Sequence, residues 1–265
     1  MKISTARVGG CMAVLALLLL SGRPVQGELL IGPSPTDVIV TTNADDASFG
    51  PFPIPGGPFP FFGMSESTFF VNSNGNLTFG TGNPLFFDSP FPITGSNFMM
   101  VAPFWDDLFL PPGEIRLNNG VELPNTVVVI WNGVGVFPGT SPTRITAEAI
   151  LVGAGSLFLA PAGTIIFSYG DITGTEDNSV TVGLNRGSGG GFANLPGLPS
   201  SLNTAQAIGL SNRVFTFTPT ATGGYTVSEG APAIIPEPAT GAMGGIAAVW
   251  FGLGYVWRRR RRAAA

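Results

Sequence analysis

The chain has 265 residues, of which 38 are glycine, 24 are proline and only 11% are charged. This content of turn-forming residues favours many short strands over long helices. The chain has no histidine and one cysteine, Cys11, which excludes histidine-based acid–base catalysis, Ser–His and Cys–His nucleophiles and histidine metal ligands.

Residues 1–27 have the pattern of a secretory signal peptide. Two basic residues near the start precede an apolar run from Met12 to Leu20, and Gly27 suits the position before a cleavage site. We therefore expect a signal-peptide helix that is removed, and a mature chain that begins near Glu28 with neither cysteine nor lysine. Cys11 precedes the apolar run, so lipidation is not expected. The alternative is an uncleaved membrane anchor, for which the apolar run is short.

The stretch from Glu28 to Trp257 contains four arginines and all 16 acidic residues, a net charge of −12. A surface of this charge repels phosphate backbones, so we expect no nucleic-acid partner. The same surface can attract cations, or it can serve only to keep an exported domain soluble.

The domain between residues 28 and 227 has the sequence pattern of an all-β, antiparallel β-sandwich. The expected strands are 38–42, 98–104, 126–131, 144–151, 165–169, 179–184 and 213–218, with a hairpin over 68–80. Apolar and polar residues alternate along several of them, as they do in a sheet with one buried face. The Asn74-Gly75 pair predicts a type I′ hairpin turn, and the Pro/Phe/Gly-dense segment 49–62 cannot be helical.

Four stretches in this order resemble the nidogen-like extracellular domain and related bacterial surface modules. They are Phe59–Gly63, Val71–Phe79, Val101–Leu108 and Gly163–Asp171, the last followed by Val182-Gly183-Leu184. The resemblance covers about residues 36–218. It implies a β-rich extracellular module associated with cell–matrix adhesion. The animal members carry cysteines and sit beside other modules, whereas we expect a mature chain with neither.

Asp106 and Asp107 are the most suggestive polar pair. Adjacent residues on a strand point to opposite faces, so the two carboxylates can share one Ca²⁺ only if they lie in a turn. The alternative is that one of them hydrogen-bonds a loop. Asp45-Asp46 and Glu176-Asp177-Asn178 are further candidates, although neither has the spacing of an EF-hand loop.

Other features admit a functional and a structural interpretation. Carboxylate pairs can hydrolyse glycosidic bonds at a suitable separation, but nothing in the sequence shows which acids converge. Gly187 to Gly191 lacks the lysine and the helix of a phosphate loop and is expected to be a surface loop. Several aromatic side chains could stack on sugars, although their strand spacing predicts a core. These are Phe59, Phe61, Phe62, Phe69, Phe70, Trp105 and Trp131.

The C-terminal segment has three parts after a linker expected at 228–238. The linker ends in Pro236-Glu237-Pro238, an uncharged stretch follows over 239–257, and five arginines, Arg258, Arg259, Arg260, Arg261 and Arg262, come next. Nineteen helical residues reach about 28 Å, which is close to the hydrocarbon thickness of a bilayer. We therefore expect a single transmembrane helix with residues 258–265 as an Arg-rich cytoplasmic tail.

These three parts resemble the PEP-CTERM sorting signal of exopolysaccharide-producing Gram-negative bacteria. The resemblance implies recognition by an exosortase-type membrane protease, cleavage near Pro236–Pro238, and only transient membrane contact. The alternative is an ordinary single-span tail anchor. The expected location is the cell envelope, the cell surface or the extracellular matrix.

The expected function is non-enzymatic: adhesion, or assembly of a biofilm or exopolysaccharide matrix, with exopolysaccharide or a matrix protein as partner. Two alternatives stay open. One is a carbohydrate-binding module for the exopolysaccharide, and the other is a polysaccharide hydrolase that uses carboxylates. No catalytic residue and no obligatory cofactor is expected, with Ca²⁺ as a candidate ligand.

Overall fold

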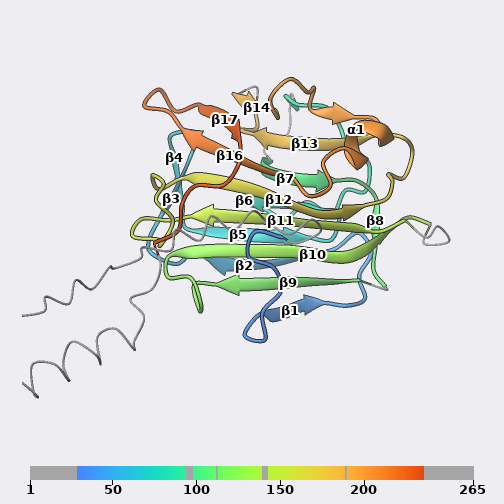
Figure 1. Ribbon diagram of the computed structural model, residues 1–265, viewed down its shortest axis with the longest axis horizontal. Helices are drawn as coiled ribbons and strands as arrows, with labels where there is room; N and C mark the ends of the chain where they lie inside the picture. The colour runs from blue at the N-terminus through green and yellow to red at the C-terminus, as the bar shows by residue number, and fades with distance from the viewer. Residues whose placement is uncertain (1–28, 94–97, 112, 139–142, 189, 236–265) are drawn as a thin grey trace, which may run out of the picture.

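The computed structural model describes residues 29–93, 98–111, 113–138, 143–188 and 190–235 (Figure 1). The expected signal-peptide helix, the Pro-Glu-Pro motif, the expected membrane span and the arginine cluster lie outside these ranges. Within them, the only helix is the single turn-and-a-half α1 (Thr204–Ile208), and no helix there is long and apolar enough to cross a membrane.

The larger of the two main sheets has eight antiparallel strands. Their spatial order is β1-β9-β10-β11-β12-β16-β17, and β8 pairs with the far end of β10. The strands are β1 (Val38–Thr41), β8 (Leu108–Phe109), β9 (Glu114–Asn119), β10 (Thr126–Val136), β11 (Ile145–Val152), β12 (Thr164–Ile172), β16 (Val214–Pro219) and β17 (Tyr225–Glu229).

The second sheet has seven strands, also antiparallel, in the order β14-β13-β7-β6-β5-β2, with β15 beside β13. These strands are β2 (Ser48–Pro53), β5 (Thr68–Asn72), β6 (Asn76–Phe79), β7 (Met99–Trp105), β13 (Val180–Asn185), β14 (Phe192–Ala193) and β15 (Ser201–Leu202). A separate hairpin of β3 (Phe59–Phe61) and β4 (Met64–Glu66) packs its phenylalanines into the core.

The two sheets share one apolar core. Alternate residues of β10, such as Val129 and Trp131, point inward and belong to the same cluster as Val71 and Val101 of the facing sheet. The Trp131 Nε1–H donates to the Asn72 carbonyl oxygen at 3.0 Å, so the core also carries a hydrogen bond between the layers. The prediction of an all-β, antiparallel sandwich is confirmed.

The hairpin predicted at Asn74-Gly75 is present, but its turn type was wrong. Asn72 pairs with Asn76, so the loop has three residues, and only Gly75, at φ +74°, has a left-handed backbone. A type I′ turn would require positive φ at two central residues. A Cβ atom on Gly75 would lie 1.7 Å from the Phe104 carbonyl oxygen. Glycine is therefore required here both for the left-handed backbone of the turn and for the close approach of β7.

A second apolar cluster covers the outer face of the larger sheet. Val128, Ile130 and Ile150 point outward and lie under Leu29, the first described residue. Fully buried Glu148 sits among them, and its two carboxylate oxygens accept hydrogen bonds from the backbone N–H groups of Ile31 (3.3 Å) and Gly32 (3.0 Å). Burial raises the pKa of Glu148 to about 7 despite these hydrogen bonds. The segment Leu29–Gly32 is therefore held as a strap across the sheet.

The described fold continues past the boundary expected at residue 227. Strand β17 runs to Glu229, and a backbone bridge then pairs Ile234 with Phe158. The Ile235 N–H donates to the Leu157 carbonyl at 2.8 Å. Ordered backbone contacts thus reach the residue that immediately precedes the Pro-Glu-Pro motif.

Candidate functional site

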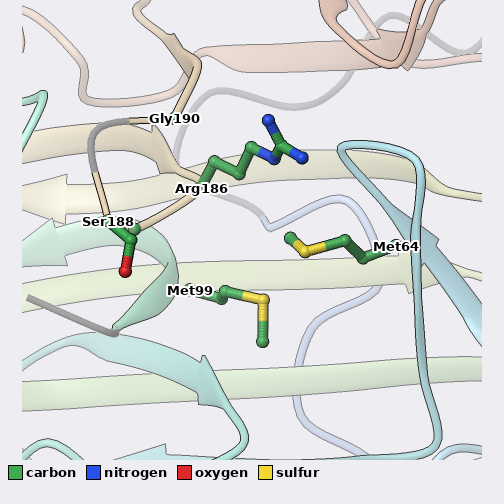
Figure 2. A pocket seen from close by; sticks show the side chains of 6 residues that line it. Met64, Met99, Arg186, Ser188 and Gly190 are labelled. Carbon is green, nitrogen blue, oxygen red and sulfur yellow. The ribbon is translucent and has the colours of Figure 1, made fainter.

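Two features at opposite ends of the second sheet stand out as candidate sites. The first is a cavity of about 380 Å³ lined by Met64, Met99, Arg186, Gly187, Ser188 and Gly190. Figure 2 shows the side chains of Arg186, Met64 and Met99 extending toward one shared space from three separate segments. We call this cavity the Arg186 pocket.

The second feature is a gathering of acidic side chains from loops at the other end of the sandwich, which we call the acidic end. It comprises Asp45, Asp46, Asp88, Asp106, Asp107, Glu176 and Asp177. Four chain segments bring these acids together, namely the β1–β2, β6–β7, β7–β8 and β12–β13 connections.

Asp106 is buried, and both oxygens of its carboxylate accept hydrogen bonds from backbone N–H groups. One oxygen accepts from the Asp107 N–H at 2.9 Å and the other from the Glu176 N–H at 3.1 Å. Loss of hydration raises the pKa of Asp106 to about 7, although these two hydrogen bonds oppose the rise. Asp106 therefore ties the β7–β8 bend to the β12–β13 loop, which matches the structural alternative considered for this pair.

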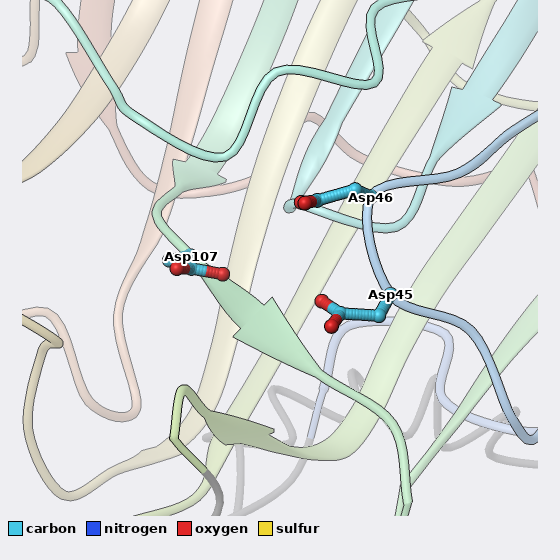
Figure 3. A group of neighbouring side chains, drawn as sticks. All are labelled: Asp45, Asp46 and Asp107. Atoms are coloured by element: carbon cyan, nitrogen blue, oxygen red, sulfur yellow. The ribbon is translucent and has the colours of Figure 1, made fainter.

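Asp107 turns instead toward Asp45 and Asp46 (Figure 3). One carboxylate oxygen from each of these residues lies within 4.8 Å of the others. Partial burial, and then the charges of Asp46, Asp45 and Glu176, raise the pKa of Asp107 to about 6. Three carboxylates at this spacing supply part of the six to eight oxygens that Ca²⁺ takes in proteins.

The predicted pair Asp106–Asp107 does lie in a bend, but the structure divides it between two acidic groups. Asp107 joins Asp45 and Asp46, whereas Asp106 joins Glu176 and Asp177. All three acidic segments singled out in the sequence therefore converge. The pairing between segments was missed because it depends on the register of strands that are distant in sequence.

Asn74 connects the acidic end to the core hairpin, a role that the sequence did not reveal. Its side-chain amide donates to Asp46 Oδ1 at 2.8 Å and to the Leu85 carbonyl at 3.2 Å, and its Oδ1 accepts from the Leu108 N–H at 3.1 Å. Asn74 is fully buried. The hairpin tip thus positions the loop that carries Asp45 and Asp46.

The aromatic side chains considered as a sugar-stacking face are instead mostly core. Phe59, Phe61, Phe62, Phe69, Trp105 and Trp131 are buried, and only Phe70 is half-buried. Their strand spacing correctly predicted a core, and the buried rings have no face available to a ligand.

A family model described as NIDO related matches residues 30–221, well over half of the chain. No solved structure matched the chain. The matched range begins in the strap and includes both the acidic end and the Arg186 pocket.

Proposed function

The chain belongs to the NIDO-related family, and from this premise we propose that it is an exported, non-enzymatic protein of the cell surface or extracellular matrix. Its role would be adhesion or the assembly of a biofilm or exopolysaccharide matrix. The family match over residues 30–221 is the observation that carries the proposal. A cysteine-free sandwich with one large shared core is consistent with a domain that is stable outside the cell without disulfides.

The sequence of the C-terminus supports sorting by a PEP-CTERM-type mechanism. Pro236-Glu237-Pro238, the uncharged stretch and Arg258–Arg262 occur in the required order. Because backbone pairing continues to Ile235, a protease would cut directly beside the folded domain, and the released chain would keep its last contacts with the sandwich. The expected product is a soluble matrix component rather than a permanent membrane protein.

The geometry of the acidic end argues against a hydrolase. Glycoside hydrolysis needs two carboxyl groups that both reach the scissile bond. Asp106 has the raised pKa of a general acid, but it is only 2% exposed and both oxygens accept backbone hydrogen bonds. A substrate could reach it only if the β12–β13 loop opened, so we assign the acidic end no catalytic role.

The experiment that tests the proposal compares producing cells with and without the gene. We expect the protein in the extracellular-matrix fraction, and weaker cell cohesion or surface attachment when it is absent. Re-expression of the wild-type chain should restore attachment. Attachment and matrix structure that stay unchanged without the protein would contradict the proposed role.

A second candidate function is a carbohydrate-binding module, and the Arg186 pocket favours it. The pocket has a volume within the range of small-ligand sites, with apolar thioethers and one cation along its wall. Binding of matrix sugar and matrix assembly are compatible, because a module that binds the polymer would anchor the domain within it.

A further inference from the structure

Arg186 occupies a position at which the core of the sandwich would otherwise continue. On β13, Val180, Val182 and Leu184 point into the core in strict alternation, and Arg186 is the next position in that row. On the neighbouring strand β7, Val101 is a core residue, and Met99, partly buried, packs against the core one step further out. Arg186 itself is exposed, and the Arg186 pocket lies at this end of the second sheet, beside the β3–β4 hairpin that carries Met64.

The loop after β13 closes on the stem of Arg186. The Arg186 N–H donates to the Gly191 carbonyl at 2.9 Å, and the Gly190 N–H donates to the Gly187 carbonyl at 2.8 Å. A Cβ atom on Gly190 would lie 2.5 Å from Arg186 Cδ and 2.8 Å from its Cβ and Cγ. Glycine at 190 therefore leaves the space in which the arginine stem lies, and the loop helps to set where the guanidinium points.

The guanidinium of Arg186 has no hydrogen-bond or ion-pair partner among the described residues. The other three arginines of the described chain are engaged. Arg116 pairs with Glu114 at 2.6 Å, Arg213 binds Glu229 through two nitrogens at 2.9 Å each, and Arg144 donates to a backbone carbonyl at 2.7 Å. In a stretch of net charge −12, a cation that faces a cavity without an acid beside it is available to an external anion.

The acidic end is too distant to neutralise this cation. Strands β7 and β13 are antiparallel, with Asn185 beside Met100 and Thr181 beside Trp105. Asp106 and Asp107 follow Trp105, and Glu176 and Asp177 precede Val180. Arg186 lies at the other end of the same two strands, about 20 Å away at ~3.3 Å per residue. That distance exceeds the Debye length of about 8 Å at physiological ionic strength. Glu66, two residues from Met64, is the acid nearest to the pocket in sequence, and it forms no ion pair with Arg186.

We propose that the Arg186 pocket binds an acidic sugar: a ring whose carboxylate pairs with the guanidinium and whose apolar face rests on Met64 and Met99. The planar guanidinium presents two parallel N–H donors that match a carboxylate. The thioethers are soft apolar surfaces that adapt to a ring face. This inference deepens the proposed function, on which it rests, by naming uronate-bearing polysaccharide as the matrix component recognised.

The test is calorimetric titration of the full chain with a tetrasaccharide of hexuronic acid and with the matched neutral tetrasaccharide. We expect the acidic oligomer to bind at least about tenfold more tightly than the neutral one, and its affinity to fall when salt is raised. A sulfated oligomer that binds through Arg186 would also support a site that recognises charge on a sugar.

Two variants address the site in different ways. Arg186→Gln removes the charge, whereas Gly190→Ala keeps it and pushes the stem aside, and each should weaken uronate binding at least about tenfold. Arg144→Gln is the charge control, and Gly224→Ala, whose Cβ would meet only the Thr220 hydroxyl at 3.5 Å, is the glycine control. Both controls should bind within about twofold of wild type.

Equal affinity for acidic and neutral oligomers, or unchanged binding by Arg186→Gln, would overturn the proposal. So would sugar-independent self-association that Arg186→Gln abolishes, because the occupant would then be a carboxylate of a second copy. Whether the protein is found in the extracellular-matrix fraction distinguishes a failure of the pocket proposal from a failure of the proposed function. A protein that is present in the matrix but does not bind uronate would reject only the proposed ligand of the pocket. A protein that is absent from the matrix would reject the proposed function.

Discussion

Replacing Glu148 with glutamine tests whether the strap over the larger sheet encloses a protonated carboxyl group. Glu148 lies opposite Ser168 on the outer face of the larger sheet, and the backbone of Ile31 and Gly32 closes over it. No basic side chain contributes to its environment: burial dominates, and hydrogen bonds from Gly32, Ile31 and Ser168 oppose it only in part. The folded protein therefore prefers this carboxyl group protonated.

The magnitude follows from the change in pKa. The pKa of Glu148 rises from 4.5 in the unfolded chain to about 7 in the fold, and each pKa unit corresponds to ~1.4 kcal/mol. Between these two values the folded state binds a proton that the unfolded state does not, so stability falls as pH rises. The contribution of Glu148 is complete below pH 4.5, and about 3 kcal/mol of it is lost by pH 7.

Denaturant unfolding of wild type and Glu148→Gln at pH 5 and pH 8 measures this contribution. Other acids, Asp106 and Asp107 among them, titrate in both proteins, so the difference between the two pH dependences isolates Glu148. Wild type should lose about 2–3 kcal/mol more of its free energy of unfolding than the variant does. Equal losses in the two proteins would mean that Glu148 ionises alike in the folded and unfolded states, which is the opposite of what its burial predicts.

Two further predictions concern the core hairpin and the acidic end. Gly75→Ala should lower the free energy of unfolding by about 2–4 kcal/mol, because its Cβ would collide with the Phe104 carbonyl. Gly197→Ala shares the left-handed backbone but meets nothing within 4 Å, so it should cost only about 1 kcal/mol; equal losses would contradict the close approach. Added Ca²⁺ should raise the melting temperature, by more at pH 7.5 than at pH 5 because the pKa of Asp107 is about 6. Asp107→Asn should abolish most of this Ca²⁺-induced increase in melting temperature. A melting temperature that changes with neither Ca²⁺ nor chelator would reject the Ca²⁺ site.

The sequence predicted a strand where apolar and polar residues alternate over a long run. Strand β11 was expected for this reason, and its inward residues belong to the core. Strand β9 was missed because only Ile115 and Leu117 of its six residues are apolar, and the rest can be recognised only beside β10. Edge strand β17 was missed because none of its residues is buried.

The candidate sites depend on pairings that local patterns do not encode. The acidic segments around Asp45, Asp107 and Glu176 were each visible, but their convergence depends on long-range strand register. The Arg186 pocket had no sequence signal beyond a glycine-rich loop. The pocket can be recognised only when the pairing of β13 with β7 places Arg186 and Met99 at the same end of the second sheet.

We propose that this NIDO-related domain is exported and then released from a temporary membrane anchor. The most direct test is the intact mass of the protein recovered from the cell surface or the surrounding matrix. We expect a chain that begins near Glu28 and ends near Pro236–Pro238, without Arg258–Arg262. A recovered protein that retains the five arginines would contradict it.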